Sequence, residues 1–406
     1  MSIEEQFDIN TKHVGLRTAA FLLALLLAVG AISFGITRIG RKVPGYQNID
    51  IVSNEEELSY ARDISFQYYL DGSSDEIKRA INEIRAFYSP TLLRVCEQLD
   101  AETEYEGVNN LATLNAKLGQ DVQLSEELFR VLLDAQSRSE AQTGFNLFGG
   151  KLNRAWRELR YLGEPEDFDP LRSEEQLERL ERLGEACRDP ENFRLTVVDA
   201  ERYIVRFEVS DGCLALFEEL EAEGPILDLG ALHDAYELQL TAQALEEKGY
   251  RNGFLSMNSG VTVLLSANPG VELQLLGKTA DGVTTAATAP AGIGCASCMM
   301  RAFAQKEGEP DYYELDGHLR HPWLPASGAY HDLLLAALAV AEDPVTACCR
   351  ILALQEITTA EEVRDIAAAG EEEIAYILND GEQTVWANSE SFSACEEYGW
   401  RLEWLG

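Results

Sequence analysis

The feature that most constrains this chain is an apolar stretch near its start, TAAFLLALLLAVGAISFGI at residues 18–36, which contains no charged side chain. At the helical rise of about 1.5 Å per residue, this length is just enough to cross a hydrocarbon layer of about 30 Å. A buried core helix is the other interpretation, but no other charge-free stretch of this length in the chain is as apolar. We therefore predict a transmembrane helix at 18–36.

The residues around this stretch indicate how the chain is organised. Residues 1–17 carry acidic side chains, which suits an uncleaved signal anchor better than a short cationic signal peptide, although cleavage within 28–31 stays open. Basic residues flank the stretch on both sides, so the positive-inside rule does not settle the orientation by itself. We expect a cytoplasmic tail at 1–17, a linker at 37–57 and an extracytoplasmic domain at 58–406.

The chain is strongly acidic. It has 406 residues, with 70 Asp and Glu against 33 Lys and Arg, and a formal net charge of -37. Such a surface repels phosphate backbones, so we expect no nucleic-acid partner. The hydrophobic content of 46% is enough for one large core or two ordinary ones.

The eight cysteines are too few for a disulfide scaffold, and only Cys295 and Cys298 form a C-x-x-C pair. A zinc site of the usual kind would need a second pair. Packing as small apolar side chains is the favoured interpretation. A local disulfide between Cys295 and Cys298 stays open if the segment lies outside the cytoplasm, whereas a thiol-redox role lacks a thioredoxin-like βαβ context.

Periodicity and turn residues predict a mixture of helices and strands without the regular alternation of a doubly wound sheet. The expected helices begin near Ile77 and at Ser125, Ser173, Leu232 and Thr359. Pro90 should interrupt the first of them. The expected strands cover 60–70, 193–198, 203–209, 261–266, 271–276, 283–288, 374–377 and 384–386. The predicted fold class is α+β.

Five segments between about residues 60 and 390 carry a resemblance to a known family. The most specific is DLGALHDAY at 228–236, and HPWLPASG at 321–328 is the next. The others are TGFN at 143–146 with Leu152 and Trp156, NSGV at 258–261 with CASC at 295–298, and DPVT at 343–346. In this order and spacing they resemble the signature stretches of the ApbE-type FAD:protein FMN transferases, which implies an ApbE-like domain.

The resemblance also implies a chemistry. Members of the family are understood to bind FAD with Mg²⁺ across its pyrophosphate and to transfer the FMN half to a threonine of a target protein, which would here be a flavin-accepting partner. Residue by residue, it assigns flavin binding to Asp228, Gly230, His233, Asn258, Gly260 and Ser297, metal binding to Asp343 and Thr346, and catalysis to His321 and Asp234.

Several positions depart from the family pattern. Asp234 stands where the family has a lysine, and Val261 stands where it has a glycine that brings backbone close to the flavin. Two unit charges about 4 Å apart interact by roughly 4 kcal/mol at a surface-like dielectric, so the reversal at Asp234 should weaken the binding of a pyrophosphate. Two hypotheses follow: an active, divergent transferase, or a catalytically inactive relative that binds flavin or a protein partner at the membrane surface.

Overall fold

The computed structural model describes residues 42–51, 64–141, 144–161, 173–268, 270–292, 295–306, 309, 312–328 and 330–405. The predicted anchor at 18–36, the tail at 1–17 and much of the linker at 37–57 lie outside these residues. None of the helices in the described ranges is long and apolar enough to span a membrane.

The chain divides into two compact units, one with residues 1–45 and 69–82 and the other with residues 46–68 and 83–406. In the first unit, the backbone N–H of Lys42 donates to Ser74 Oγ at 3.1 Å. Ser73 and Glu76 form a reciprocal cap there, in which the Ser73 N–H donates to Glu76 Oε2 at 2.8 Å. This cap starts the helix α2, Ser74–Leu99, which continues into the second unit.

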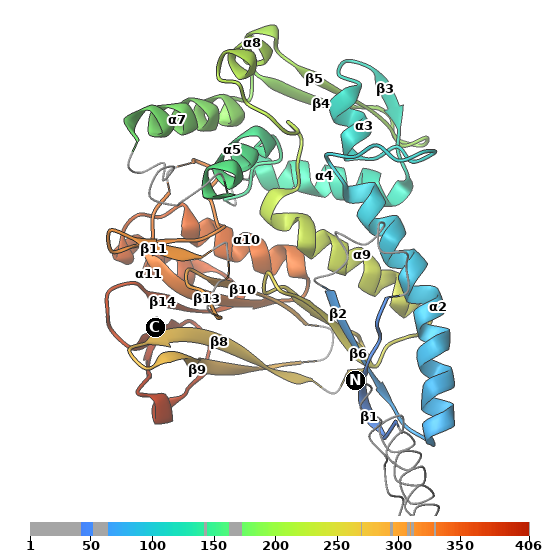
Figure 1. Ribbon diagram of the computed structural model, residues 1–406, viewed down its shortest axis with the longest axis vertical. Coiled ribbons are helices and arrows are strands. Elements are labelled where there is room, and N and C mark those ends of the chain that lie inside the picture. The colour runs from blue at the N-terminus through green and yellow to red at the C-terminus, as the bar shows by residue number, and fades with distance from the viewer. Residues whose placement is uncertain are drawn as a thin grey trace, which may run out of the picture. The chain divides into compact units, whose positions relative to one another are not determined.

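The second unit is built on a nine-stranded sheet (Figure 1). Its strands pair antiparallel from β2 to β15, and β15 pairs with β17 in parallel. The strand order is β1 (Gly45–Asn48), β2 (Ile64–Leu70), β6 (Gly253–Met257), β7 (Thr262–Leu264), β10 (Ala296–Arg301), β13 (Leu334–Ala341), β14 (Glu373–Leu378), β15 (Thr384–Ala387) and β17 (Arg401–Trp404).

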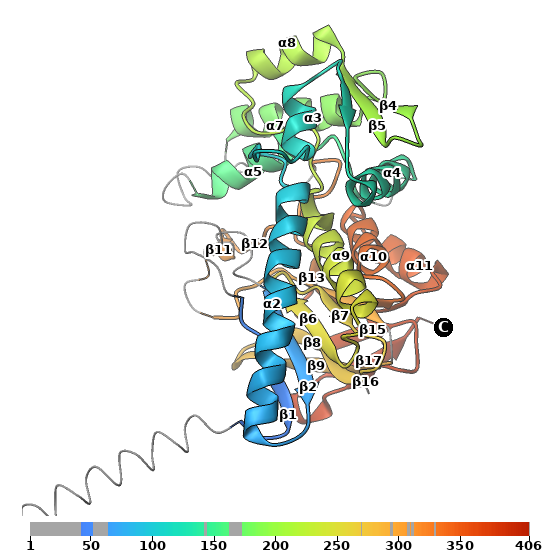
Figure 2. The same ribbon diagram turned by 90° about the vertical axis from the view of Figure 1, so that its right-hand side faces the viewer.

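Helices cover one face of this sheet and a smaller sheet covers the other. Figures 1 and 2 both show α9 (His233–Glu247) and α10 (Pro344–Gln355) side by side on the helical face. The opposite face packs against the sheet of β16 (Ser393–Ala394), β9 (Gly282–Ala291) and β8 (Val271–Thr279). Leu275, Phe303 and Trp400 belong to the apolar core between the two sheets.

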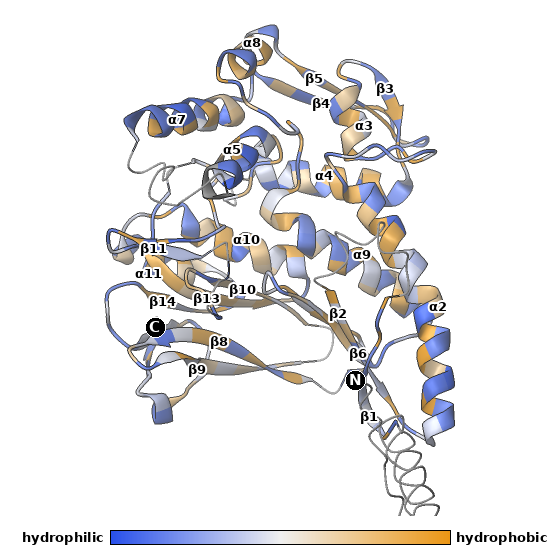
Figure 3. Ribbon diagram, viewed as in Figure 1, coloured by the Kyte–Doolittle hydropathy of each residue, from blue (hydrophilic) through white to orange (hydrophobic). Residues whose placement is uncertain are grey.

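The segment between α2 and α9 forms a further layer of helices around a small antiparallel sheet. Ser125 and Ser173 cap two of its helices through their side-chain oxygens, as predicted. Its elements are α3 (Leu111–Ala116), β3 (Asp121–Gln123), α4 (Glu126–Glu140), α5 (Gly150–Tyr161), α7 (Glu174–Arg188), β4 (Phe193–Asp199), β5 (Ile204–Val209), α8 (Asp211–Glu219) and the 3-10 turn η3 (Gly230–Leu232). In Figure 3, α7 is largely hydrophilic, which is typical of a helix at the surface.

The remaining elements are short or close the chain. They are β11 (Tyr313–Leu315), which pairs with β12 (His318–Arg320), the helix α11 (Ala360–Ala369) and the 3-10 turn η4 (Glu396–Tyr398). Thr359 caps α11, and the predicted hairpin at 374–386 forms as β14 and β15. The α+β expectation is confirmed.

One local expectation is wrong. The first helix does not stop at Pro90, because α2 runs on to Leu99 and buries Leu92 and Val95 completely. Burial of that apolar face outweighs the hydrogen bond that proline cannot donate. The disulfide that stayed open between Cys295 and Cys298 is not formed, since none of the eight cysteines is in a disulfide, and Cys298 packs as a buried side chain within β10, the favoured interpretation.

Candidate functional site

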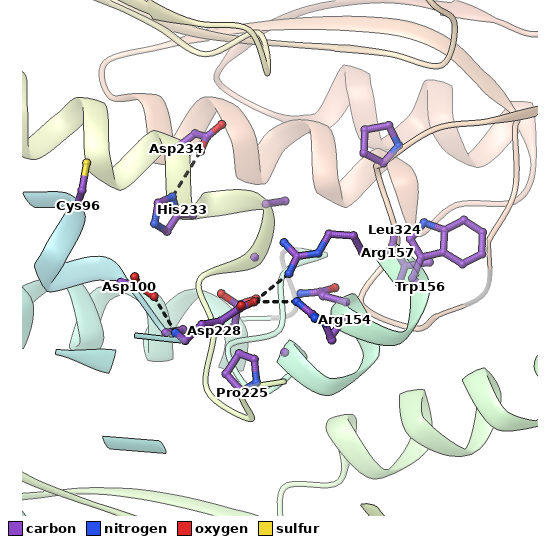
Figure 4. Close-up of a pocket in the computed structure, with 17 residues that line it drawn as sticks. Cys96, Asp100, Arg154, Trp156, Arg157, Pro225, Asp228, His233, Asp234 and Leu324 are labelled. Carbon is purple, nitrogen blue, oxygen red and sulfur yellow. Dashed lines mark hydrogen bonds and ion pairs between the residues drawn. The ribbon is translucent and has the colours of Figure 1, made fainter. Parts of the chain in front are cut away.

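A cavity of about 570 Å³ opens in front of η3 and the first turn of α9 (Figure 4). The segment 225–234 lines one side, α5 lines another, and the end of α2 lines a third. Asn115 holds the backbone of the first segment in place. Its Oδ1 accepts from the N–H groups of Ile226 and Leu227, and its Nδ2 donates to Leu227 O at 2.9 Å. Because the side-chain amide of Asn115 both accepts from and donates to the loop backbone, it makes this wall of the cavity rigid.

Glycines allow this loop to lie close to α5. Gly230 has a φ of +49°, and a Cβ there would lie 2.8 Å from Asn153 Nδ2. At Gly150 a Cβ would meet Pro225 O at 2.6 Å. Both positions therefore need glycine for close packing between the loop and α5.

Charged side chains of both signs line the cavity, and most of them are already engaged with one another. Arg154 and Arg157 both reach Glu102 Oε1, at 3.4 and 2.8 Å. Both arginines are labelled in Figure 4, where dashed lines run from their guanidinium groups. Asp100 accepts from the backbone N–H groups of Glu102 and Thr103 and from the hydroxyl of Tyr105. An anionic ligand would have to draw the two guanidinium groups away from Glu102.

The first turn of α9 brings three further ionisable groups together. His233 Nδ1 lies 3.4 Å from Asp234 Oδ1 and 3.6 Å from Glu237 Oε2. His233 and Asp234 keep about 30% of their side-chain surface exposed at the cavity, whereas Glu237 is 1% exposed. From α2, Cys96 Sγ donates to Glu237 Oε1 at 3.0 Å.

This cluster shifts the pKa values of its members. Burial lowers the pKa of His233, yet the hydrogen bond to Asp234 and the charge of Glu237 outweigh burial and raise this pKa to about 9. Burial raises the pKa of Asp234, but the hydrogen bond and charge of His233 bring it below its usual value. Burial also raises the pKa of Glu237, and burial together with Glu237 raises that of the Cys96 thiol.

A second cluster lies at the start of α10. Asp343 caps this helix: its Oδ1 accepts from the Thr346 N–H at 2.8 Å and its Oδ2 accepts from Thr346 Oγ1 at 2.7 Å. Arg138 of α4 donates to Thr346 Oγ1 at 3.3 Å, forms an ion pair with Asp134 at 2.8 Å and lies 3.9 Å from Asp343 Oδ1. Tyr236 of α9 donates to Asp134 at 2.7 Å, so a chain of contacts joins the two clusters.

Comparison with known proteins identifies the family. The model of the ApbE family matches residues 68–271, just over half of the chain. The chain belongs to the ApbE family.

Solved structures agree with this assignment at the level of the fold. An ApbE protein from Thermotoga maritima is 17% identical with a TM-score of 0.56, and the match covers 87% of this chain and 98% of that one. The flavin transferase ApbE from Vibrio cholerae is 11% identical with a TM-score of 0.53, over 86% and 95% of the two chains. The apo flavinyl transferase ApbE from Pseudomonas stutzeri is 13% identical with a TM-score of 0.51, over 84% and 94%. No curated protein matches the sequence.

The structure brings together only part of the predicted ApbE site. Asp228, Gly230, His233 and Asp234 line the cavity in front of α9. The turn with Asn258 and Gly260 touches this group through Ser259, which forms a hydrogen bond with Asp234. Gly260, at a φ of +102°, packs so closely that a Cβ would lie 2.1 Å from Met299 O.

The other predicted residues lie apart from this cavity. Ser297 is buried in β10, between Thr262 and Val340 of the neighbouring strands. His321 is fully buried, with its ring 5.0 Å from that of Tyr330, and its neighbours Pro322 and Leu324 line the cavity in its place. The expected catalytic position of His321 is therefore not at the cavity wall.

Asp343 and Thr346 do not fit a Mg²⁺ ion as they stand. They line a different cavity, of about 600 Å³, with Cys295 and the acidic residues 371–373. Both oxygens of Asp343 already accept hydrogen bonds, and the guanidinium of Arg138 supplies the positive charge. A divalent cation at these ligands would face a fixed cation at close range. Where the resemblance implies a metal ion, Asp343 forms an ion pair with Arg138 in the structure.

Sequence reasoning missed the groups that complete both clusters. Glu237 follows His233 by four residues, a spacing that places both on one face of a helix, and this signal was available. Cys96 and Arg138 lie on other helices, and nothing in their local sequence indicates their partners. The local sequence does not indicate the partners of Arg154 and Arg157 either, because α5 has the pattern of an ordinary basic amphipathic helix.

Proposed function

We propose that this chain is a flavin-binding member of the ApbE family that takes a flavin dinucleotide into the cavity in front of α9, and that it does not carry out Mg²⁺-dependent transfer of FMN to a threonine. The solved relatives are named as flavin transferases, which supports the flavin as ligand. The absence of Mg²⁺-dependent transfer is inferred from the position of Arg138, which lies among Asp134, Asp343 and Thr346.

The cavity offers a limited means of holding a dinucleotide. Arg154 and Arg157 are the guanidinium groups on its wall, and they would bind the pyrophosphate after leaving Glu102. Trp156 also contributes to the wall and stacks on Tyr330, with ring centroids 4.7 Å apart. Asp234, at the position of the family's lysine, opposes the same anion. The proposal is therefore binding of modest affinity.

The test uses the full chain in detergent, incubated with FAD, Mg²⁺ and a threonine-bearing acceptor protein. We expect quenching of flavin fluorescence on binding and no covalently fluorescent acceptor on a denaturing gel. The Vibrio cholerae flavin transferase serves as the positive control. Transfer above the enzyme-free background would establish the alternative, an active and divergent transferase, and absence of flavin binding would overturn the proposal as a whole.

A matched pair of variants locates the ligand. Arg157→Gln removes one of the two guanidinium groups on the cavity wall and should weaken FAD binding by roughly tenfold. Arg130→Gln makes the same change on α4, where Arg130 pairs with Glu126 on an exposed surface, and should leave binding unchanged. Equal effects of the two variants would mean that the flavin lies elsewhere.

We further infer that residues 18–36 anchor the chain in a membrane and that the folded domain lies on the extracytoplasmic side, next to a flavin-accepting or other protein partner. The support is the charge-free apolar stretch and its flanking residues. Fractionation of cells followed by protease treatment of intact cells tests this. Protection of the domain from an external protease would contradict the orientation.

A further inference from the structure

The start of α9 carries a mixed set of metal-ligating side chains that the family pattern does not account for. One ligand atom each from His233, Asp234 and Glu237 lies within 4.8 Å of the other two. Two of these separations are 3.4 Å, from His233 Nδ1 to Asp234 Oδ1, and 3.6 Å, from His233 Nδ1 to Glu237 Oε2. Donor atoms bound at about 2.0–2.2 Å to a tetrahedral ion lie about 3.3–3.6 Å apart. Both measured separations fall in this range.

The cluster holds two carboxylates against one imidazole, so a protonated His233 balances only one of the two negative charges. Glu237 is a carboxylate with 1% of its side-chain surface exposed, and Asp234 lies beside it. In the part of the chain that the structure describes, neither forms an ion pair with a lysine or arginine. Buried carboxylates are normally paired or coordinate a metal, because an uncompensated buried charge is costly.

Neighbouring groups orient the ligand atoms. Cys96 donates to Glu237 Oε1, which leaves Oε2 directed toward His233. Ser259 forms a hydrogen bond with Asp234 from the turn between β6 and β7. Outer hydrogen bonds of this kind fix the ligands of protein metal sites before the ion arrives.

We propose that His233, Asp234 and Glu237 bind a divalent transition-metal ion of the Zn²⁺ or Co²⁺ class at the wall of the cavity in front of α9. Three protein ligands leave a fourth position open, and it faces the cavity because His233 and Asp234 line it. An imidazole among the ligands favours these ions over Mg²⁺, which prefers oxygen ligands in octahedral geometry. This site goes beyond the proposed function, since it requires neither flavin nor acceptor.

The test is titration of the metal-stripped, tag-free full chain in detergent with Co²⁺. Coordination by nitrogen and carboxylate oxygens in a low-symmetry site gives visible absorption bands that free Co²⁺ lacks, and their amplitude reports occupancy. We expect one Co²⁺ per chain, displaced by Zn²⁺ and not by an excess of Mg²⁺. No flavin is present, so the outcome is independent of whether the chain binds or transfers one.

Three variants decide which residues hold the ion. Glu237→Gln keeps the shape and an acceptor for Cys96 but removes the charge, and His233→Ala removes the nitrogen ligand. Each should weaken Co²⁺ binding by about 10- to 100-fold or more. Glu247→Gln makes the same chemical change on an exposed position of the same helix and should bind like the parent chain. Thermal unfolding followed by circular dichroism confirms that each metal-free variant is folded.

Two results would overturn the proposal. One is a folded parent chain that takes up neither Co²⁺ nor Zn²⁺ at micromolar concentrations. The other is binding that persists unchanged in both Glu237→Gln and His233→Ala, because the ion would then occupy other ligands.

Discussion

The helices α9 and α10 pack against each other on the same face of the sheet, and each carries an acidic cluster near its start; the two clusters are compensated in different ways. At α10, Asp343 faces the guanidinium of Arg138, a cation whose charge does not change in any ordinary pH range. At α9, the cation that faces Asp234 and Glu237 among the described residues is the imidazole of His233, whose charge can be lost. The ion pair at α10 therefore keeps its charge at any ordinary pH. The charge of the cluster at α9 changes with pH, and this cluster could accept an incoming ion.

The difference reverses what the family pattern implies. By resemblance, the acid at 343 binds a metal and position 234 carries a cation. In this chain the cation Arg138 lies beside Asp343, and an acid occupies position 234. Tyr236 donates to Asp134, which also pairs with Arg138, so a chain of contacts joins α9 to the second cluster. Substitutions at Asp234 and Arg138 test whether these two residues determine which cluster binds a ligand.

The largest effect should come from restoring the family's charge with Asp234→Lys. The variant removes an anion and adds a cation next to a bound pyrophosphate, which should tighten FAD binding by about 3 kcal/mol, or roughly 100-fold, after allowance for partial exposure. Fluorescence titration measures it, and the variant should also lose Co²⁺ binding. Glu247→Lys, on the exposed side of α9, is the control and should change FAD affinity by less than about twofold. Equal affinity in both variants would place the pyrophosphate away from α9.

Removal of the fixed cation should open the second cluster. Arg138→Met leaves Asp134 and Asp343 without their ion pair and should lower the free energy of unfolding by about 2 kcal/mol, because the hydrogen bonds are charged but partly exposed. Mg²⁺ should then raise the Tm of the variant and not that of the parent chain. Arg130→Met breaks an exposed pair on the same helix and should cost less than about 0.5 kcal/mol. A Mg²⁺ response in the parent chain would contradict the idea that Arg138 closes the site.

The imidazole cluster should make stability depend on pH. In the folded chain the pKa of His233 lies near 9, above its ordinary value of 6.5, because of Asp234, Glu237 and Asp228. Its contribution is therefore fully present below about pH 6.5 and is lost as the pH rises through 9. With a chelator present, denaturant unfolding should show a loss of about 2 kcal/mol over this window. His233→Gln should flatten the slope, and an unchanged slope in that variant would assign it to other groups.

Much of the fold could be predicted from the sequence, because the signals were local. Ser125, Ser173 and Thr359 cap helices where their spacing to the following residues indicated, and 374–386 forms the expected hairpin. The strand β13, with the sequence LLAALAVA, was missed because a strand buried on both faces has no alternation to reveal it. The assignment of β8 and β9 to a separate sheet depends on long-range packing that no local pattern carries.

The site was less predictable than the fold, for a physical reason. Motif order located the loop 228–236 and Asp343, and both lie at the starts of adjacent helices. Which groups compensate them depends on side chains from α2 and α4, namely Cys96 and Arg138, that only the tertiary structure brings in. Compensation of charge is a property of neighbours in space, so a sequence motif alone could not reveal it.

The smallest effect concerns the contact that joins the two clusters. Tyr236 is buried, and its hydroxyl donates to Asp134 Oδ2 at 2.7 Å. Tyr236→Phe keeps the ring and removes this one hydrogen bond, while Arg138 still pairs with Asp134, so the free energy of unfolding should fall by about 1 kcal/mol. Tyr398→Phe, at an exposed position, should stay within about 0.5 kcal/mol of the parent chain.

If the clusters are coupled through the hydroxyl of Tyr236, the double variant Tyr236→Phe with Arg138→Met will lose less free energy of unfolding than the sum of the two single losses, since Asp134 connects both residues. Simple additivity in that double-mutant cycle would show that the two clusters act independently despite their proximity.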